Sequence, residues 1–115
     1  RRFLSQFYFE ALSENHELVL PYVPHWADPA WHLYVVRHQE RDQLQQRLSV
    51  SGIGSLIHYP EPPYRSDAYK GEVDRSAGWL ITEELVSTVL SLPMGPHLTL
   101  NDAGIVIDAL RQALR

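Results

Sequence analysis

Strand-like segments are few and short in this chain, which limits the folds open to it. Residues 31–38, WHLYVVRH, are dense in aromatic and β-branched side chains and indicate a strand. Residues 53–59 are mostly apolar without strict alternation, so we expect a central, buried strand there. A third short strand, 89–94, is closed by Pro93. A further apolar piece, 17–24, contains two prolines and is typical of an edge segment.

Segments whose apolar residues have helical spacing lie between and beside these strands. The last helical segment follows Thr99, whose Thr-Leu-Asn-Asp start is close to a capping box. The segments with this spacing are residues 3–12, 41–50, 82–90 and 99–114. This order predicts an α+β fold, with a small mixed or antiparallel sheet of about three strands and helices packed mainly on one face.

Alternating strands and helices also allow a doubly wound parallel sheet. The pair Gly52 and Gly54 forms a G-x-G, but the third glycine of a dinucleotide fingerprint would fall at Ile57. The pair also follows a helix and precedes a strand, the reverse of the order that phosphate binding at a helix N-terminus needs. We therefore interpret these glycines as a helix C-cap and a tight turn into the strand.

Size and composition indicate one ordinary globular domain, residues 1–115, with 44% hydrophobic and 21% charged residues. The net charge of −4 and the lack of any Lys/Arg cluster argue against nucleic-acid binding. Apolar runs are far shorter than the ~20 residues of a membrane span. Cysteine is absent, which is compatible with the cytoplasm, where we expect the protein. The chain begins without Met and inside a helical pattern, so we expect a piece of a longer protein.

Residues with the chemistry for catalysis or metal binding are present but scattered. No two of the six histidines are four apart on a helix, so we expect no metal site. Ser55 lies outside any nucleophile-elbow pattern. Lys70, the only lysine, lies in a polar loop, whereas a Schiff-base lysine needs a desolvated pocket. We therefore assign no catalytic residue.

His58 and Tyr59 end the second predicted strand and directly precede a proline-rich turn. A histidine at such a place can donate or accept hydrogen bonds near neutral pH. Adjacent strand residues point to opposite faces, so only one of the two rings can face a given pocket unless the chain bends. From residue chemistry alone, a solvated strand end is favoured over a ligand site.

Five sequence stretches occur in a characteristic order and spacing. They are WHLYVVR (31–37), RDQL (41–44), GIGSLIHYPEPP (52–63), AYKG (68–71) and LSLPMGPHLT (90–99). Together they resemble the C-terminal domain of DegT/DnrJ-type sugar-nucleotide aminotransferases, which are fold-type-I enzymes that use pyridoxal phosphate. The resemblance covers nearly the whole chain. It departs at WLITE (79–83), where the family commonly has Phe-Pro-x-Ala-Glu, and this leaves the start of the following helix open.

The resemblance implies a parent enzyme that moves an amino group, typically from glutamate, to a nucleotide-linked keto sugar. In that family the large domain carries the Schiff-base lysine and most cofactor contacts. We expect this domain to be absent here, so that the fragment is inactive and binds no pyridoxal phosphate. His58 and Tyr59 match the family's "HY" and imply substrate binding through hydrogen bonds to the sugar or its diphosphate. Tyr34 and Arg37 are further substrate-binding candidates.

Two other interpretations remain open at this point. One is a stand-alone α+β binding or interaction module that descends from such a domain and has lost catalysis. The other is a small ferredoxin-like regulatory domain, which leaves the His-Tyr-Pro and Leu-Pro-Met pieces unexplained.

The parent is expected to be a homodimer, and an excised domain is expected to self-associate through its exposed apolar face. Within the leading helix, the aromatic residues are the candidates for that face: Phe3, Phe7, Tyr8 and Phe9.

Overall fold

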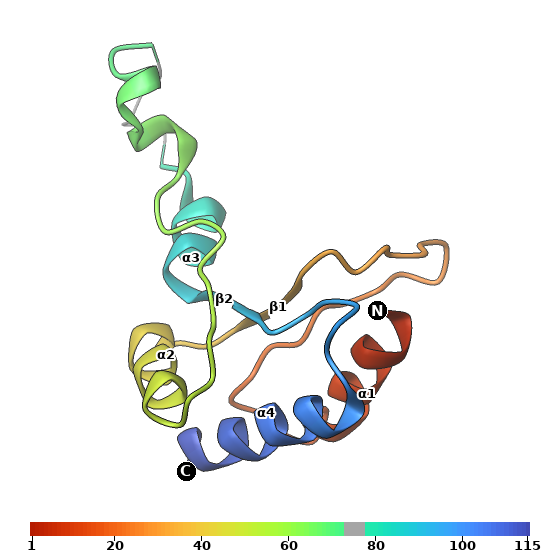
Figure 1. Ribbon diagram of the computed structural model, residues 1–115. Coiled ribbons are helices and arrows are strands. Elements are labelled where there is room, and N and C mark those ends of the chain that lie inside the picture. The colour runs from red at the N-terminus through yellow and green to blue at the C-terminus, as the bar shows by residue number, and fades with distance from the viewer. Residues whose placement is uncertain (73–77) are drawn as a thin grey trace.

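The computed structural model describes residues 1–72 and 78–115. In chain order its elements are α1 (Arg2–Leu12), β1 (Tyr34–Arg37), α2 (Arg41–Val50), the 3₁₀ turns η1 (Pro63–Arg65) and η2 (Asp67–Tyr69), α3 (Leu80–Thr88), β2 (Val89–Leu92) and α4 (Leu100–Ala113) (Figure 1). All four expected helices are confirmed, and so are the first and third expected strands. The helix at WLITE, whose start the resemblance does not fix, begins at Leu80 and has no side-chain cap.

The sheet consists of β1 and β2, which pair antiparallel with Tyr34 opposite Leu92. Each strand gains one isolated bridge on its free side, from Val19 to β1 and from Leu56 to β2. Val19 belongs to the proline-interrupted segment, which thus lies at an edge of the sheet. The predicted small antiparallel sheet of an α+β fold is confirmed.

The expectation that residues 53–59 form a central, buried strand is wrong. The segment meets β2 only through Leu56, whose backbone exchanges two hydrogen bonds with Ser91, of 2.7 and 3.2 Å. It occupies the outer position because β1 takes the other side of β2. Prolines from Pro60 onward cannot extend the ladder. Its apolar residues therefore divide: Ile53 is buried, whereas the Leu56 side chain is 65% exposed.

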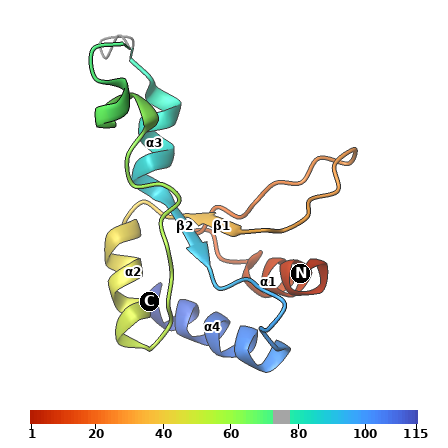
Figure 2. The same cartoon turned by 45° about the horizontal axis from the view of Figure 1, so that its top comes forward.

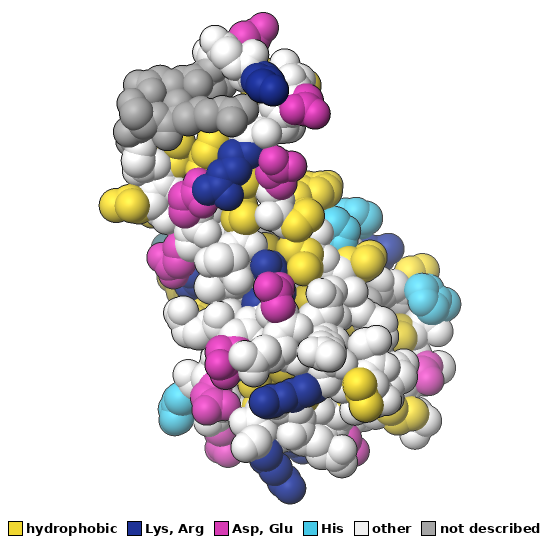
Figure 3. Space-filling model, turned by 90° about the vertical axis from the view of Figure 1, so that its left-hand side faces the viewer, with side chains coloured by type: hydrophobic (Ala, Val, Ile, Leu, Met, Phe, Trp, Pro, Cys, Tyr) yellow, Lys and Arg dark blue, Asp and Glu magenta, His cyan; other side chains and the backbone are white. Residues whose placement is uncertain are grey.

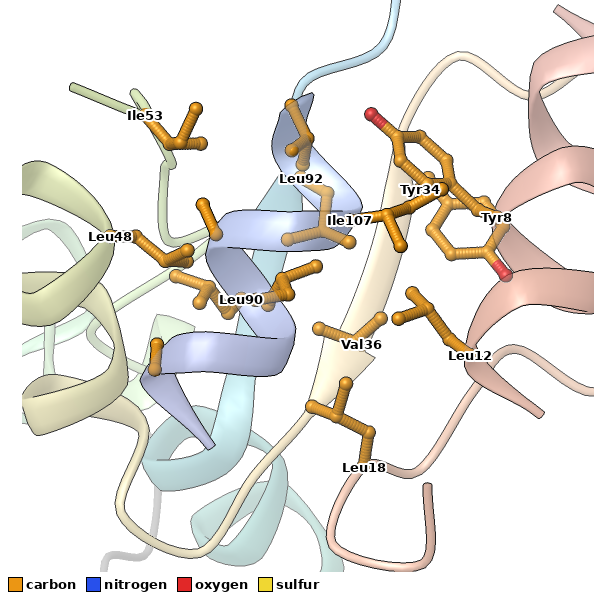
Figure 4. Packing of buried hydrophobic residues seen from close by; sticks show 14 of the residues in the cluster. Tyr8, Leu12, Leu18, Tyr34, Val36, Leu48, Ile53, Leu90, Leu92 and Ile107 are labelled. Carbon is orange, nitrogen blue, oxygen red and sulfur yellow. The ribbon is translucent and has the colours of Figure 1, made fainter. Parts of the chain in front are cut away.

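Helices α1, α2 and α4 pack together against one side of the strands, with α4 in contact with both of the others (Figure 2). Side chains from these helices and both strands meet in one core (Figure 4). Its largest fully buried members include Tyr8, Leu12, Tyr34, Val36, Leu44, Leu48, Leu90 and Leu110. None of the described helices is long and apolar enough to cross a membrane.

The end of α2 explains the glycine pair. Gly52 has a φ of +78°, and its N–H donates to the Ser49 carbonyl at 3.0 Å. The next N–H, of Ile53, donates to the Leu48 carbonyl at 2.9 Å, which completes a Schellman motif. The interpretation of Gly52 as a helix C-cap is confirmed.

The capping box expected at Thr99 is also present. The Asp102 N–H donates to the Thr99 hydroxyl, and the Asp102 carboxylate accepts from the Thr99 backbone N–H and hydroxyl. These hydrogen bonds hold the pKa of the Asp102 carboxyl below its ordinary value. The box fixes where α4 begins, and so places the core face of that helix against the sheet.

An arm, made of residues 58–72 and 78–88, projects from this core (Figure 1). It makes the molecule elongated, with principal extents of 48 × 36 × 27 Å. The radius of gyration is 15.7 Å, against roughly 13 Å for a compact chain of this length. Within the arm, α3 buries only Thr88, and Leu80 and Ile81 are more than 70% exposed. Hydrophobic side chains gather along the arm in Figure 3.

Arg41 ties the base of the arm to α2. Its side chain is almost completely buried, and Nη1 donates to the carbonyls of Val86 and Val89 at 3.1 and 2.9 Å. These carbonyls lie at the C-terminal end of α3, where the helix leaves them without intrahelical partners. The guanidinium therefore fixes α3 relative to the body through charge-assisted hydrogen bonds.

The aromatic residues of α1 do not share one exposed face. Phe3 and Phe9 are exposed, but Phe7 packs against the core. Tyr8 is fully buried, and its hydroxyl donates to the Pro93 carbonyl at 2.8 Å. Including Tyr8 among the residues of a self-association face was therefore wrong, because Tyr8 is an interior residue with a satisfied hydroxyl.

Candidate functional site

His58 and Tyr59 together line a cavity of about 370 Å³ where the arm leaves the body. One wall comes from the proline-rich turn after Tyr59, and the other comes from α3 and the start of β2. The full lining is His58, Tyr59, Glu61, Pro62, Pro63, Ser66, Thr82, Leu85, Val86 and Val89. Because Arg41 holds the last turn of α3, it also holds this second wall in place.

Both residues of the His-Tyr pair line the same cavity, although the side chains of neighbouring strand residues ordinarily point to opposite faces. The peptide bond between them is cis. Their ring centroids are 5.4 Å apart with the planes at 87°, an edge-to-face contact. Tyr59 is 72% exposed, so its hydroxyl is accessible to a ligand.

His58 is anchored by Ser91. The His58 Nδ1 and Ser91 Oγ atoms are 2.8 Å apart, and Ser91 is buried in the middle of β2. Sequence reasoning did not single out Ser91. A signal was available, since it is the only polar residue of the strand sequence VLSL.

The charge of the cavity limits what it can bind. Among its described lining residues, Glu61 is the one carboxylate, and no Lys or Arg is present. A cavity of this kind disfavours a diphosphate, whose charge needs cationic or multiple N–H partners. Apolar proline, leucine and valine side chains, with His58 and Tyr59 as hydrogen-bonding groups, suit an uncharged ligand with ring carbons and hydroxyls.

The structure does not bring Arg37 to this cavity. Arg37 ends β1 and lines a separate cavity of about 460 Å³, beside His38 and Glu40. Its guanidinium forms an ion pair with Glu84 of α3 at 3.1 Å. This ion pair occupies part of the hydrogen-bonding capacity that Arg37 would offer an anion.

Tyr34 is a core residue by its surroundings. Its ring packs between Tyr8 and Trp31, with centroids 5.1 and 5.5 Å away. The buried hydroxyl has no hydrogen-bond partner among the described residues, and burial raises the pKa of Tyr34 to about 12. Tyr34 borders a third cavity, of about 530 Å³, together with Tyr22 and Trp31. Of the four predicted binding residues, only His58 and Tyr59 share a cavity.

Lys70 does not fit the role of a Schiff-base lysine. It is an exposed residue that follows η2, and it lines none of the described cavities. A covalent pyridoxal phosphate site needs a lysine in a desolvated pocket. The described residues therefore do not form that site.

The family model of the DegT/DnrJ/EryC1/StrS aminotransferase family matches residues 1–111 of the chain. The matched range contains the five stretches, the lining residues of the His-Tyr cavity, and Ser91. The chain belongs to this family.

Relatives of known sequence and structure agree with this assignment. The chain is 41% identical over 96% of its length to the erythromycin biosynthesis sensory transduction protein EryC1 of Saccharopolyspora erythraea. It is 40% identical over 97% of its length to dTDP-3-amino-3,4,6-trideoxy-alpha-D-glucose transaminase of Streptomyces venezuelae. The crystal structure of S. venezuelae DesV, solved in complex with a ketimine intermediate, superposes with a TM-score of 0.94 at 38% identity, covering 99% of this chain and 31% of that one. The chain spans about 30% of the length of the two curated relatives.

Proposed function

We propose that this chain is the small, substrate-side domain of a pyridoxal phosphate-dependent aminotransferase that acts on a nucleotide-linked keto sugar. The observation that carries the proposal is the cavity shared by His58 and Tyr59 in a chain of this family. The relative from S. venezuelae, whose name specifies a dTDP-linked amino sugar, supports the substrate class. In this proposal, residues 1–115 correspond to the C-terminal domain of a longer, cytoplasmic enzyme.

The chemistry of the transfer then lies outside the chain. Pyridoxal phosphate supplies the electron sink for transamination, and it needs a lysine to hold it. Because Lys70 is exposed and away from the described cavities, that lysine belongs to the large domain of the parent enzyme. The chain by itself contributes binding and domain packing, no catalytic residue and no transaminase activity.

His58 and Tyr59 bind the sugar end of the substrate in this account. Their rings offer hydrogen-bonding atoms, while the apolar wall of Leu85 and Val86 can contact ring carbons. Glu61 at the same cavity favours the uncharged sugar over the diphosphate. The diphosphate would lie toward the large domain or the second subunit of a homodimer.

Tyr34 and Arg37 stay predictions as substrate contacts. Arg37 would have to exchange its ion pair with Glu84 for a phosphate oxygen. Tyr34 would have to reach the ligand from the cavity near Trp31, with the hydroxyl that has no partner in the part of the chain that the structure describes. Self-association of the isolated domain would use exposed apolar residues such as Phe3, Phe9 and Ile81.

Titration of the ¹⁵N-labelled chain with dTDP-glucose tests the binding role. We expect saturable amide shifts at Tyr59, Thr82 and Val86, and we expect His58→Ala to weaken binding. His25→Ala is the matched control, since His25 is exposed and lines none of the described cavities. Shifts confined to the Arg37 cavity, or no shifts up to millimolar ligand, would refute substrate binding at the His-Tyr cavity.

A further inference from the structure

Ser91 is a buried hydroxyl residue with one described hydrogen-bond partner for its side chain. It is 4% exposed, and its Oγ lies 2.8 Å from His58 Nδ1. Its backbone is held on both sides, because Ser91 pairs with Val35 across the sheet and exchanges two hydrogen bonds with Leu56. The hydroxyl is therefore a fixed point against which the imidazole can be aligned.

The direction of the hydrogen bond follows from where the hydroxyl proton can go. A serine hydroxyl has one proton to donate and two lone pairs, and a neutral imidazole has one N–H and one bare nitrogen. If His58 Nδ1–H donated to Ser91, the serine proton would need another acceptor. The part of the chain that the structure describes offers the Ser91 hydroxyl none. A buried donor without an acceptor is costly, so Ser91 O–H donates to a bare Nδ1.

We propose that Ser91 is a positioning residue that holds His58 as the Nε2–H tautomer and so makes His58 a hydrogen-bond donor to the ligand in the His-Tyr cavity. The acceptor is a hydroxyl or carbonyl oxygen of the sugar. The hydrogen bond from His58 Nε2–H to the sugar rests on the proposed function, whereas the assignment of the tautomer does not. Within the described residues, no protein group accepts a hydrogen bond from His58 Nε2, which leaves this nitrogen available to a ligand.

Long-range ¹H–¹⁵N spectra of the labelled chain, at a pH at which imidazoles are neutral, read the tautomer directly. We expect His58 to show the two distinct ¹⁵N shifts of a single Nε2–H tautomer, and the exposed His25 serves as an internal reference for an exchanging ring. Ser91→Ala should move the ¹⁵N chemical shifts of the His58 ring toward the averaged values of an exchanging imidazole. Ser91→Thr should restore the two distinct shifts. Ser55→Ala is the matched control, because Ser55 Oγ is buried without touching any described polar partner.

An Nδ1–H tautomer in the unmodified chain would overturn the proposal, and so would averaged nitrogen shifts. Unchanged ¹⁵N chemical shifts of the His58 ring in Ser91→Ala would overturn it as well.

Binding of dTDP-glucose separates this inference from the proposed function. We expect Ser91→Ala to bind about 3- to 10-fold more weakly, the value of one neutral hydrogen bond, and to add little to His58→Ala. A single Nε2–H tautomer in a chain that does not bind dTDP-glucose would refute the proposed function and leave the positioning role intact.

Discussion

The rings of Tyr8 and Tyr34 pack against each other in the core at a tilt of 39°, and among the described residues one of the two hydroxyls has a hydrogen-bond partner. Tyr8 donates to the Pro93 carbonyl, whereas the buried Tyr34 hydroxyl meets no hydrogen-bond partner in residues 1–72 and 78–115. Tyr8→Phe should lower the free energy of unfolding by about 0.5–1.5 kcal/mol, and Tyr34→Phe should leave it unchanged or raise it. Urea unfolding of both variants measures the difference. Equal losses in the two variants would show that the Tyr34 hydroxyl also has a partner.

The same tyrosines predict a loss of stability at alkaline pH. Burial raises the pKa of Tyr34 from 10.0 to about 12, and burial with a smaller effect of Tyr34 raises the pKa of Tyr8. Above about pH 10 the unfolded chain loses these protons while the folded chain retains them. The free energy of unfolding should therefore fall from about pH 10 toward 12, by up to about 1.4 kcal/mol per pH unit for each tyrosine.

Denaturant midpoints across this range provide the measurement. Tyr34→Phe removes one of the two raised groups and should flatten the decline. The stability contributed by the neutral tyrosines is fully present below about pH 10. A midpoint that stays constant between pH 10 and 12 would contradict the burial of these hydroxyls.

Single side chains were predictable where they belonged to a motif. His58 and Tyr59 were selected from the HYP stretch, and the structure places both at one cavity. Their common orientation was not predictable, because strand geometry puts neighbouring residues on opposite faces. Ser91 stands out locally as the one polar residue of the strand sequence VLSL, but its partner, His58, lies 33 positions away, and the local pattern does not identify that partner.

At the level of elements, the two glycines after α2 offer a matched pair. Gly52 has a φ of +78°, and a Cβ at Gly54 would meet open space at an ordinary φ. Gly52→Ala should cost roughly 1–2 kcal/mol, the penalty of a left-handed non-glycine residue. Gly54→Ala should be close to neutral. Thermal unfolding of both variants distinguishes the C-cap from a merely flexible loop, and equal effects would argue against the C-cap.

Helices were predicted better than the sheet for a physical reason. The periodicity of α4 and the cap at Thr99 are local, and both appear in the structure. The place of a strand in a sheet depends on which partners it finds. Residues 53–59 looked central because they are apolar, yet β1 occupies the inner side of β2 and leaves Leu56 at the edge.

The whole molecule is a compact body with a projecting arm, and the His-Tyr cavity lies at the base of the arm, where the arm leaves the body. The arm buries little of its own apolar surface, as Leu80 and Ile81 show, although the body has a complete core. Exposed apolar surface of this kind is typical of interaction sites, and under the proposed function it would contact the large domain or the second subunit. It agrees with a chain that spans about 30% of its curated relatives.

A domain exchange tests the central claim most directly. The matching 30% of the S. venezuelae transaminase is replaced by this chain, and transamination of that enzyme's own substrate is measured. We predict an active chimera in which His58→Ala raises KM at least roughly tenfold while kcat changes little, since the role proposed for His58 is substrate binding and not reaction. His25→Ala, an exposed histidine outside the described cavities, should match the unmodified chimera. A folded chimera that binds pyridoxal phosphate but does not transaminate, or a His58→Ala chimera with unchanged KM, would contradict the account.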